Sequence, residues 1–238
     1  MCGRYVAKSQ PDEIARYFGA AMTETLVEAP PEANFNVAPT SEVMIVLERE
    51  HTRCVDLARW GLVPSWAKDR SIGARMINAR AETLASKPAF KRAFQRKRCI
   101  VPADGFYEWK VIAGQKRKQP VYIHRADGDH FAFAGLWELW RNPEAPDDAP
   151  LRTCTIITGP ANAKIAPVHD RMPVMLAPDA WATWLDHDNH DTDALRALFV
   201  PAPASLIEIH AVSTAVNSVR NKSPELIDPV PSEVPLDA

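Results

Sequence analysis

The apolar positions of this chain gather in short segments that are rich in β-branched and aromatic residues. Segments of this length and composition are typical of β-strands. The pattern predicts strands over residues 43–48, 54–63, 99–111, 121–125, 130–140, 153–159, 173–177 and 205–213. An Asp-Gly pair divides segment 99–111, which predicts two strands joined by a turn. The basic segment 114–120 is expected to form the tip of a hairpin.

Helices are predicted in the intervening stretches, over residues 9–19, 87–98, 178–186 and 193–199. At the start of the first helix, Ser9 and Asp12 resemble a capping box. Pro11 suits the first helical turn, and Gly19 suits the end of the helix. The strands outnumber the helices, and the helices are interspersed irregularly. This order favours an α+β fold over a doubly wound one.

The length and composition suit one domain. The chain has 238 residues, of which 46% are hydrophobic, so it can bury a sizeable core. We expect the domain to span residues 1–225, followed by a flexible tail over 226–238 that is rich in proline and acidic residues. The net charge of −2 and the pI of about 6.4 exclude a globally basic nucleic-acid-binding protein. A local basic face remains compatible with these values.

The chain carries no sign of membrane insertion or secretion. No run of 18 apolar residues occurs, and the first twenty residues lack the apolar segment of a signal peptide. We therefore expect a cytoplasmic location. The cysteines form no C-x-x-C pair and are predicted to be free thiols rather than a disulfide framework. They are Cys2, Cys54, Cys99 and Cys154.

Cys2 follows the initiator methionine directly. If Met1 is removed, Cys2 carries a thiol with a reference pKa of about 8.5 and an α-amine with one of about 8. These two nucleophiles are two carbons apart, so together they can close a five-membered ring on one aldehyde carbon. The alternative is a buried structural cysteine, the commoner role for this residue type. Its place at the chain start argues against burial.

Two further segments carry candidate chemistry. Asn78, Arg80 and Glu82 occur at a spacing of two, so on a strand they would share one face. Asn can orient a carbonyl and Arg can bind phosphate, although a solvated strand face is an equal alternative. Glu108 is flanked by aromatic residues. If it points inward, burial raises its pKa and suits it to acid–base catalysis; if it points outward, it is an ordinary surface glutamate.

His169 is a candidate proton shuttle near neutral pH, with Asp170 able to orient it; the alternative is an ordinary loop histidine. Trp66 lies ahead of two basic residues and could stack on a nucleic-acid base, although a core position is at least as compatible. The segment DHDNHD (186–191) contains metal-binding residue types. Its spacing fits no zinc motif, so a polar loop is expected and no metal site is predicted.

Six motifs follow one another along the chain. They are MCGRY (1–5), NVAP (36–39), WGLVPSW (60–66), INARAE (77–82), GFYEW (105–109) and HDRMP (169–173). Together they resemble the SOS response-associated peptidase family, the abasic-site processing domain, over residues 2–225. The resemblance implies an α+β fold in which a mixed, largely antiparallel sheet curls into a barrel-like core with peripheral helices.

The resemblance also implies a function. The expected activity is DNA repair, in which Cys2, freed of Met1, forms a covalent thiazolidine crosslink with an abasic site in single-stranded DNA and shields the lesion. The expected protein is a monomer without metal or cofactor that associates with the nucleoid when bound to DNA. The alternatives are an autoproteolytic cysteine peptidase, with Cys2 as nucleophile and His169 as base, and a non-catalytic DNA-binding module.

The family's roles map onto residues of this sequence. Cys2 is similar to the nucleophile, Asn78 to the residue that positions it, Glu108 to the acid–base residue, and His169 to the histidine that assists opening of the sugar ring. The implied DNA-binding residues are Arg4, Asn36, Pro39, Trp66, Arg80, Thr158 and Arg171, of which Thr158 is the weaker match.

Overall fold

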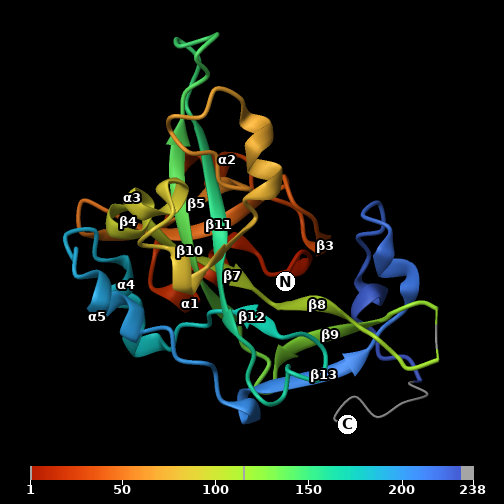
Figure 1. Ribbon diagram of the computed structural model, residues 1–238. Coiled ribbons are helices and arrows are strands. Elements are labelled where there is room, and N and C mark those ends of the chain that lie inside the picture. The colour runs from red at the N-terminus through yellow and green to blue at the C-terminus, as the bar shows by residue number, and fades with distance from the viewer. Residues whose placement is uncertain (1, 115, 232–238) are drawn as a thin grey trace.

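The computed structural model describes residues 2–114 and 116–231 and confirms the α+β class with a barrel-like core (Figure 1). The strands are β1 (Tyr5–Ala7), β2 (Ala21–Met22), β3 (Asn34–Val37), β4 (Glu42–Arg49), β5 (Thr52–Trp60), β6 (Asn78–Arg80), β7 (Arg98–Ala103), β8 (Gly105–Lys110), β9 (Gln119–Arg125), β10 (Phe131–Trp140), β11 (Leu151–Pro160), β12 (Arg171–Pro173) and β13 (Ile207–Ala211). The α-helices are α1 (Pro11–Phe18), α2 (Glu24–Glu28), α3 (Pro88–Arg96), α4 (Trp181–Leu185) and α5 (Thr192–Ala197). Short 3-10 helices include Arg70–Arg75, Ala81–Thr83 and Pro224–Ile227.

A closed ring of strands forms the core. Strands β11, β10, β7, β4 and β5 pair antiparallel in that order. The ring closes because β5 also pairs in parallel with β11, where Trp60 lies opposite Cys154. Closure leaves the central strands without a free edge. Strand β2 extends the ring beside β5, and β6 and β12 both pair with β11.

Alternate residues of the barrel strands point to opposite sides of its wall. On β4, Ile45 belongs to the interior apolar cluster, whereas Val46 belongs to the outer one. Helices α1, α3 and α4 cover this outer face with Phe18, Phe94 and Trp184. The predicted helices therefore form, and they lie around the barrel as expected. Among the described residues no helix is long and apolar enough to cross a membrane.

A second sheet, ordered β13-β9-β8-β1-β3, is antiparallel throughout. The two strands predicted over 99–111 both form, but they do not make a hairpin. The chain crosses between sheets at Asp104, because β7 belongs to the barrel and β8 to the second sheet. Gly105 is required at this crossing, since a Cβ there would lie 2.4 Å from the ring of Tyr122.

Asp104 also fixes the chain ahead of α1. Its carboxylate accepts hydrogen bonds from the N–H (3.2 Å) and the hydroxyl (2.6 Å) of Ser9. The predicted capping box is therefore wrong, because Ser9 binds Asp104 and Gln10 takes the N-cap position without a side-chain bond. The end of the helix is as predicted, with Gly19 in the left-handed conformation at a φ of 59°.

Two other predicted segments form in part. Strands β8 and β9 pair as a hairpin, with the basic segment 114–120 at its tip as expected. Residue 115 of this segment lies outside the described residues. Segment 173–177 contributes only its first residue to β12, and Met175 adds an isolated bridge to Phe133.

The packed domain extends beyond the expected boundary at residue 225. Leu226 is buried in a small apolar cluster with Tyr107 of β8 and Tyr122 of β9. The Val230 N–H donates to the Ala211 carbonyl at the end of β13 (2.9 Å). Residues 226–231 are therefore part of the fold rather than of a flexible tail. Residues 232–238 lie outside the described part of the chain.

A close approach of two glycines positions the segment that leads into β6. Strand β5 ends at Trp60, because the backbone turns at Gly61 with a φ of 127°. A Cβ on Gly73 would lie 2.5 Å from the carbonyl oxygen of Gly61. This contact lets the Leu62 N–H donate to the Met76 carbonyl (3.1 Å) and carries the chain into β6 beside β11.

Gly73→Ala is therefore expected to destabilise the protein. The added methyl meets a backbone oxygen that cannot move aside, at a cost of about 2 kcal/mol, which corresponds to about 4–8 °C in Tm for a domain of this size. Thermal unfolding followed by circular dichroism measures the shift. Gly159→Ala is the matched control, since its Cβ would meet only a Val174 methyl at 3.5 Å. Equal Tm values for the two variants would contradict this account.

Candidate active site

The N-terminal segment runs beside β8 and brings Cys2 close to Glu108. Strand β1 pairs antiparallel with β8, and the Tyr107 N–H donates to the Arg4 carbonyl (3.0 Å). Cys2 and Phe106 both belong to the interior apolar cluster. Glu108 lies two residues after Phe106 and so faces the same side of the strand. The structure thus brings together two residues that are far apart in the sequence.

Cys2 is fully buried, so the expectation that its terminal place keeps it exposed is wrong. The cause is the position of β1 between β3 and β8, which holds the segment on both sides. Burial raises the pKa of the Cys2 thiol, and the neighbouring Glu108 carboxylate raises it further. The thiol is therefore protonated near neutral pH and must give up its proton when it reacts. All four cysteines are free thiols, as predicted.

Glu108 points inward, the condition under which its pKa was expected to rise. Its side chain is only 4% exposed and lies beside the interior cluster that includes Phe106. Burial raises the pKa of Glu108, and the charges of His169 and Lys118 act in the opposite direction. A raised pKa brings this carboxyl group closer to neutral pH than an ordinary glutamate, which favours a role in proton transfer.

Asn78 holds the N-terminal segment in place. Its Nδ2 donates to the carbonyl oxygen of Cys2 at 2.7 Å. Strand β6 places this side chain by pairing in parallel with β11, where Asn78 lies opposite Ile156. The Oδ1 atom of Asn78 is buried and has no hydrogen-bond partner among the described residues. It is therefore available to a ligand beside Cys2.

Arg80 shares the face of Asn78, since Ala79 between them points into the outer cluster. Its side chain is exposed, as a phosphate contact requires. Glu82 does not continue this face as expected, because the strand ends and a 3-10 helix begins at Ala81. Glu82 instead accepts two hydrogen bonds from Arg171, at 3.0 and 2.9 Å.

Arg171 and Thr158 lie on paired strands at the edge of this group. The Arg171 guanidinium also donates to the Thr158 carbonyl (2.6 Å). Arg171 therefore links β11 to the 3-10 helix that follows β6 and contains Glu82. Thr158 is fully buried and lies opposite Arg80 in the β6–β11 pair. Within the described part of the chain its hydroxyl has no partner, which leaves a second buried polar atom available near Arg80.

His169 lies between β11 and β12 with its ring 30% exposed. Its Nδ1 accepts the Arg171 N–H (3.0 Å) and lies 2.9 Å from the Asp170 carboxylate. Both contacts involve the same ring nitrogen and hold the ring in the loop ahead of β12.

Arg4 and Asn36 are joined in an internal network. The Arg4 guanidinium donates to Asn36 Oδ1 (2.7 Å) and to the Val216 carbonyl (3.0 Å). The Asn36 amide in turn donates to three carbonyls of the segment 216–221, at 2.8 to 3.2 Å. These contacts position β1 and β3 against that C-terminal segment.

Trp66 is 60% exposed in the loop after β5, so it is not part of the core. Pro39 lies between β3 and β4, next to Thr40. The Thr40 N–H donates to the Trp60 carbonyl at the end of β5 (2.8 Å). Among the described residues, no hydrogen bond or ring contact joins Trp66 to the group around Cys2. Stacking on a base therefore stays a prediction for this residue.

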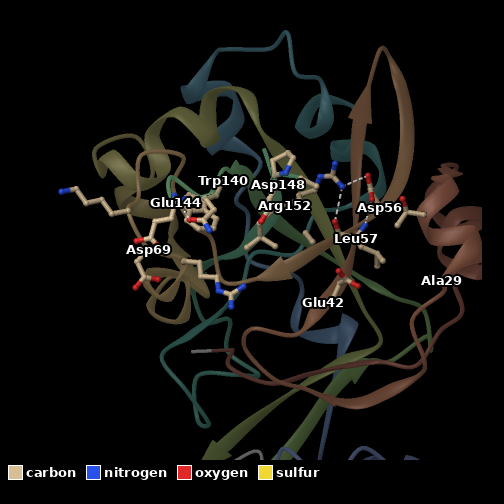
Figure 2. Close-up of a pocket in the computed structure, with 17 residues that line it drawn as sticks. Ala29, Glu42, Asp56, Leu57, Asp69, Trp140, Glu144, Asp148 and Arg152 are labelled. Carbon is tan, nitrogen blue, oxygen red and sulfur yellow. Dashed lines mark hydrogen bonds and ion pairs between the residues drawn. The ribbon is translucent and has the colours of Figure 1, made fainter. Parts of the chain in front are cut away.

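Figure 2 shows a cavity of about 1040 Å³ that lies away from this group, since neither Cys2 nor Glu108 lines it. Acidic residues outnumber basic ones on its walls, so it is a poor site for a nucleic-acid backbone. The charged lining residues are Glu42, Asp56, Asp69, Glu144 and Asp148 against Lys68, Arg70 and Arg152.

The fold and the site define a β-barrel protein in which a thiol near the N-terminus is buried beside a carboxyl group. A family model described as SOS response associated peptidase (SRAP) matches residues 1–219. The abasic site processing protein YoqW of Bacillus subtilis (strain 168) is 44% identical over 228 residues, covering 96% of this chain and 99% of that protein. YedK of Escherichia coli (strain K12), named likewise, is 34% identical over 234 residues, covering 97% and 100%. The chain belongs to the SRAP family.

Solved structures agree on the fold. A crystal structure of a protein from Bacteroides thetaiotaomicron superposes with a TM-score of 0.85 at 22% identity, over 96% of this chain and 100% of that one. A phage-related protein from Bordetella bronchiseptica gives a TM-score of 0.65 at 27% identity, over 89% and 94%.

Sequence reasoning missed Lys118 as part of the site's surroundings. It treated the basic segment 114–120 only as a hairpin tip, whereas the charge of Lys118 reaches Glu108. Lys110, two residues after Glu108 on β8, is also nearly buried at 6% exposure. Lys110 could have been found from the alternation of β8, which puts Glu108 and Lys110 on the same face of the strand.

Glu108→Gln is expected to change how stability depends on pH. Because burial raises its pKa above the ordinary 4.5, Glu108 binds a proton more tightly in the folded protein than in the unfolded chain. The free energy of unfolding therefore falls as pH rises through the window between these two pKa values. The variant lacks this loss, so its Tm relative to the native protein should increase as the pH rises above 4.5.

The control is Glu42→Gln, which changes an exposed glutamate at the start of β4. Its Tm difference from the native protein should stay the same across that pH range. A Glu108→Gln difference that is equally flat would show that the carboxyl group of Glu108 has no raised pKa.

Proposed function

We propose that this protein processes abasic sites in single-stranded DNA by forming a covalent thiazolidine crosslink through Cys2, once Met1 has been removed. The observation that carries the proposal is the burial of the Cys2 thiol beside the Glu108 carboxyl group, on a segment that Asn78 holds by its carbonyl. The names of the relatives, abasic site processing proteins, support the same substrate class.

The chemistry follows from the two nucleophiles of an N-terminal cysteine. The Cys2 amine attacks C1′ of the ring-opened sugar, and the carbonyl oxygen leaves as water after Glu108 supplies a proton. The thiol sulfur then adds to the same carbon of the imine. The imine is protonated once water has left, so the thiol proton returns to the Glu108 carboxylate as the sulfur adds. The nitrogen takes the electron pair of the C=N bond and keeps its one hydrogen. One water is released for each ring formed, and no electron is gained or lost.

The neighbouring residues serve the same reaction. The Oδ1 of Asn78 and the hydroxyl of Thr158 are buried polar atoms without a hydrogen-bond partner among the described residues, and they would bind the sugar as it enters the site. His169 would open the sugar ring by moving a proton. Exposed Arg80 binds the phosphate backbone beside them. Because the lesion lacks a base, affinity rests on such contacts rather than on base-edge recognition.

Cys2→Ala is expected to abolish a crosslink that survives denaturing gels, because both ring-forming steps need this residue. A glycine inserted between Met1 and Cys2 should abolish it too, since the thiol remains but the amine moves to another residue. Intact mass measurement after incubation with abasic single-stranded DNA detects the adduct as protein plus DNA minus one water.

Cys54→Ala is the matched control, because Cys54 is also buried but lies on β5. It should crosslink like the native protein. An undiminished crosslink in the insertion variant would overturn the role of the amine. The competing function, a cysteine peptidase with Cys2 as nucleophile and His169 as base, produces no DNA adduct and would be favoured if the native protein gave none.

Arg80→Ala is expected to lower the affinity for single-stranded DNA several-fold at low salt. Loss of one phosphate contact should also reduce the slope of log K against log salt by about 0.7. Fluorescence anisotropy over a salt series measures both quantities. Arg141→Ala, an exposed arginine beyond the end of β10, is the control. Equal slopes for the two variants would remove Arg80 from the DNA-binding surface.

A further inference from the structure

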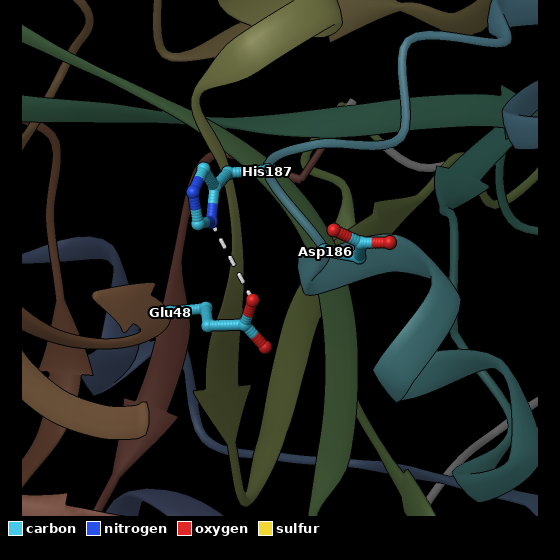
Figure 3. Close-up of side chains that lie close together, drawn as sticks. All are labelled: Glu48, Asp186 and His187. Atoms are coloured by element: carbon cyan, nitrogen blue, oxygen red, sulfur yellow. Dashed lines mark ion pairs between the residues drawn. The ribbon is translucent and has the colours of Figure 1, made fainter. Parts of the chain in front are cut away.

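A histidine and two carboxylates meet where the end of β4 faces the segment after α4, outside the site described above. Figure 3 shows Glu48, Asp186 and His187 at this place. One ligand atom from each residue lies within 4.8 Å of the others. Ligand atoms of a tetrahedral ion with bonds of about 2.0–2.1 Å lie roughly 3.3 Å apart, so the more widely spaced atoms must approach by up to about 1.5 Å, through side-chain rotation, to bind one ion.

The spacing of His187 and Glu48 fits a shared ion better than a hydrogen bond. The His187 Nδ1 lies 3.5 Å from Glu48 Oε1, beyond the usual 2.7–3.2 Å of a hydrogen bond. It is close to the roughly 3.3 Å between neighbouring ligands in a tetrahedral site with bonds of about 2.0–2.1 Å. This Nδ1 atom is buried and accepts no hydrogen bond from any described residue.

The other side of the ring completes the pattern. The His187 Nε2 lies 3.5 Å from Asp188 Oδ1. A metal on Nδ1 would leave the proton on Nε2, and a small approach of the Asp188 carboxylate from its 3.5 Å would give the hydrogen bond that commonly orients a metal-binding histidine. A cavity of about 560 Å³ lies against the cluster, and its lining includes Glu48, His51 and Asp186, so an ion and its waters can enter.

The two arginines near the cluster, Arg53 and Arg98, donate hydrogen bonds to backbone carbonyls rather than to the two carboxylates. Arg98 is buried beneath the segment, but its guanidinium donates to backbone carbonyls, including those of Asp186 and Asn189. Arg53, opposite Glu48 on β5, donates to the Phe18 carbonyl. Arg98 thus fixes the backbone of the segment, and neither arginine donates to the two carboxylates. One oxygen of Asp186, Oδ1, accepts the Asp188 N–H (2.9 Å).

We propose that Glu48, Asp186 and His187 bind a divalent transition ion of the zinc type, which links the β4–β5 hairpin to the segment between α4 and α5. The imidazole and carboxylate ligands favour such an ion over Mg²⁺, which prefers oxygen ligands alone. The local spacing within 186–191 could not indicate this site, because Glu48 comes from a distant strand.

The test uses the untagged full chain, freed of metal and titrated with Zn²⁺ near neutral pH by calorimetry, with Co²⁺ absorption as a second readout. One equivalent should bind and raise the Tm. Glu48→Gln and His187→Asn should each weaken binding at least tenfold. His190→Asn is the matched control in the same segment, since the ring of His190 lies against the Gln95 carbonyl (3.1 Å) rather than in the cluster. This variant should bind Zn²⁺ like the native protein.

Circular dichroism of each variant without metal shows whether it folds. Asp188→Asn keeps all three ligands and should weaken binding by a smaller factor, so it tests the site if His187→Asn unfolds. Absence of binding by the native protein would overturn the proposal. So would binding that is unchanged in Glu48→Gln and lost in Cys2→Ala, because the ion would then lie on the thiol.

Discussion

The parallel pairing of β11 with both β5 and β6 is the constraint on which the rest of the structure depends. Its contact with β5 closes the barrel, and its contact with β6 places Asn78 and Arg80 on one side of the wall. The pairing requires the chain after β5 to turn sharply and return, which the close approach of Gly61 and Gly73 makes possible. A backbone contact between two residues without side chains thus determines where the Asn78 amide can hold the N-terminal segment.

The candidate site gains its chemical character from removal of water. Burial raises the pKa of the Cys2 thiol and of the Glu108 carboxyl group, and the Glu108 charge raises that of Cys2 further. The thiol therefore holds a proton that the proposed ring closure must move. The charge of Lys118 acts on the pKa of Glu108 in the opposite direction.

Local patterns in the sequence were sufficient for most elements, because short apolar segments and end signals such as Gly19 act over a few residues. They were insufficient wherever the partner is distant. The Asp-Gly pair at Asp104 signals a turn, but only tertiary packing shows that it joins two sheets. Cys2 looked exposed because a terminus usually is, and only the pairing of β1 with β3 and β8 explains its burial. Glu108 was identified from its aromatic neighbours, whereas the effect of Lys118 on it depends on the shape of a hairpin.

The place of β1 in the second sheet also sets the order in which the site can assemble. Cys2 lies far from Asn78 and Glu108 along the chain, and Asn78 is fixed only when β6 has paired with β11. Contacts of such long sequence separation form late in folding. The candidate site therefore assembles only after strands that are distant in the sequence have come together, and until then Cys2 is an ordinary cysteine.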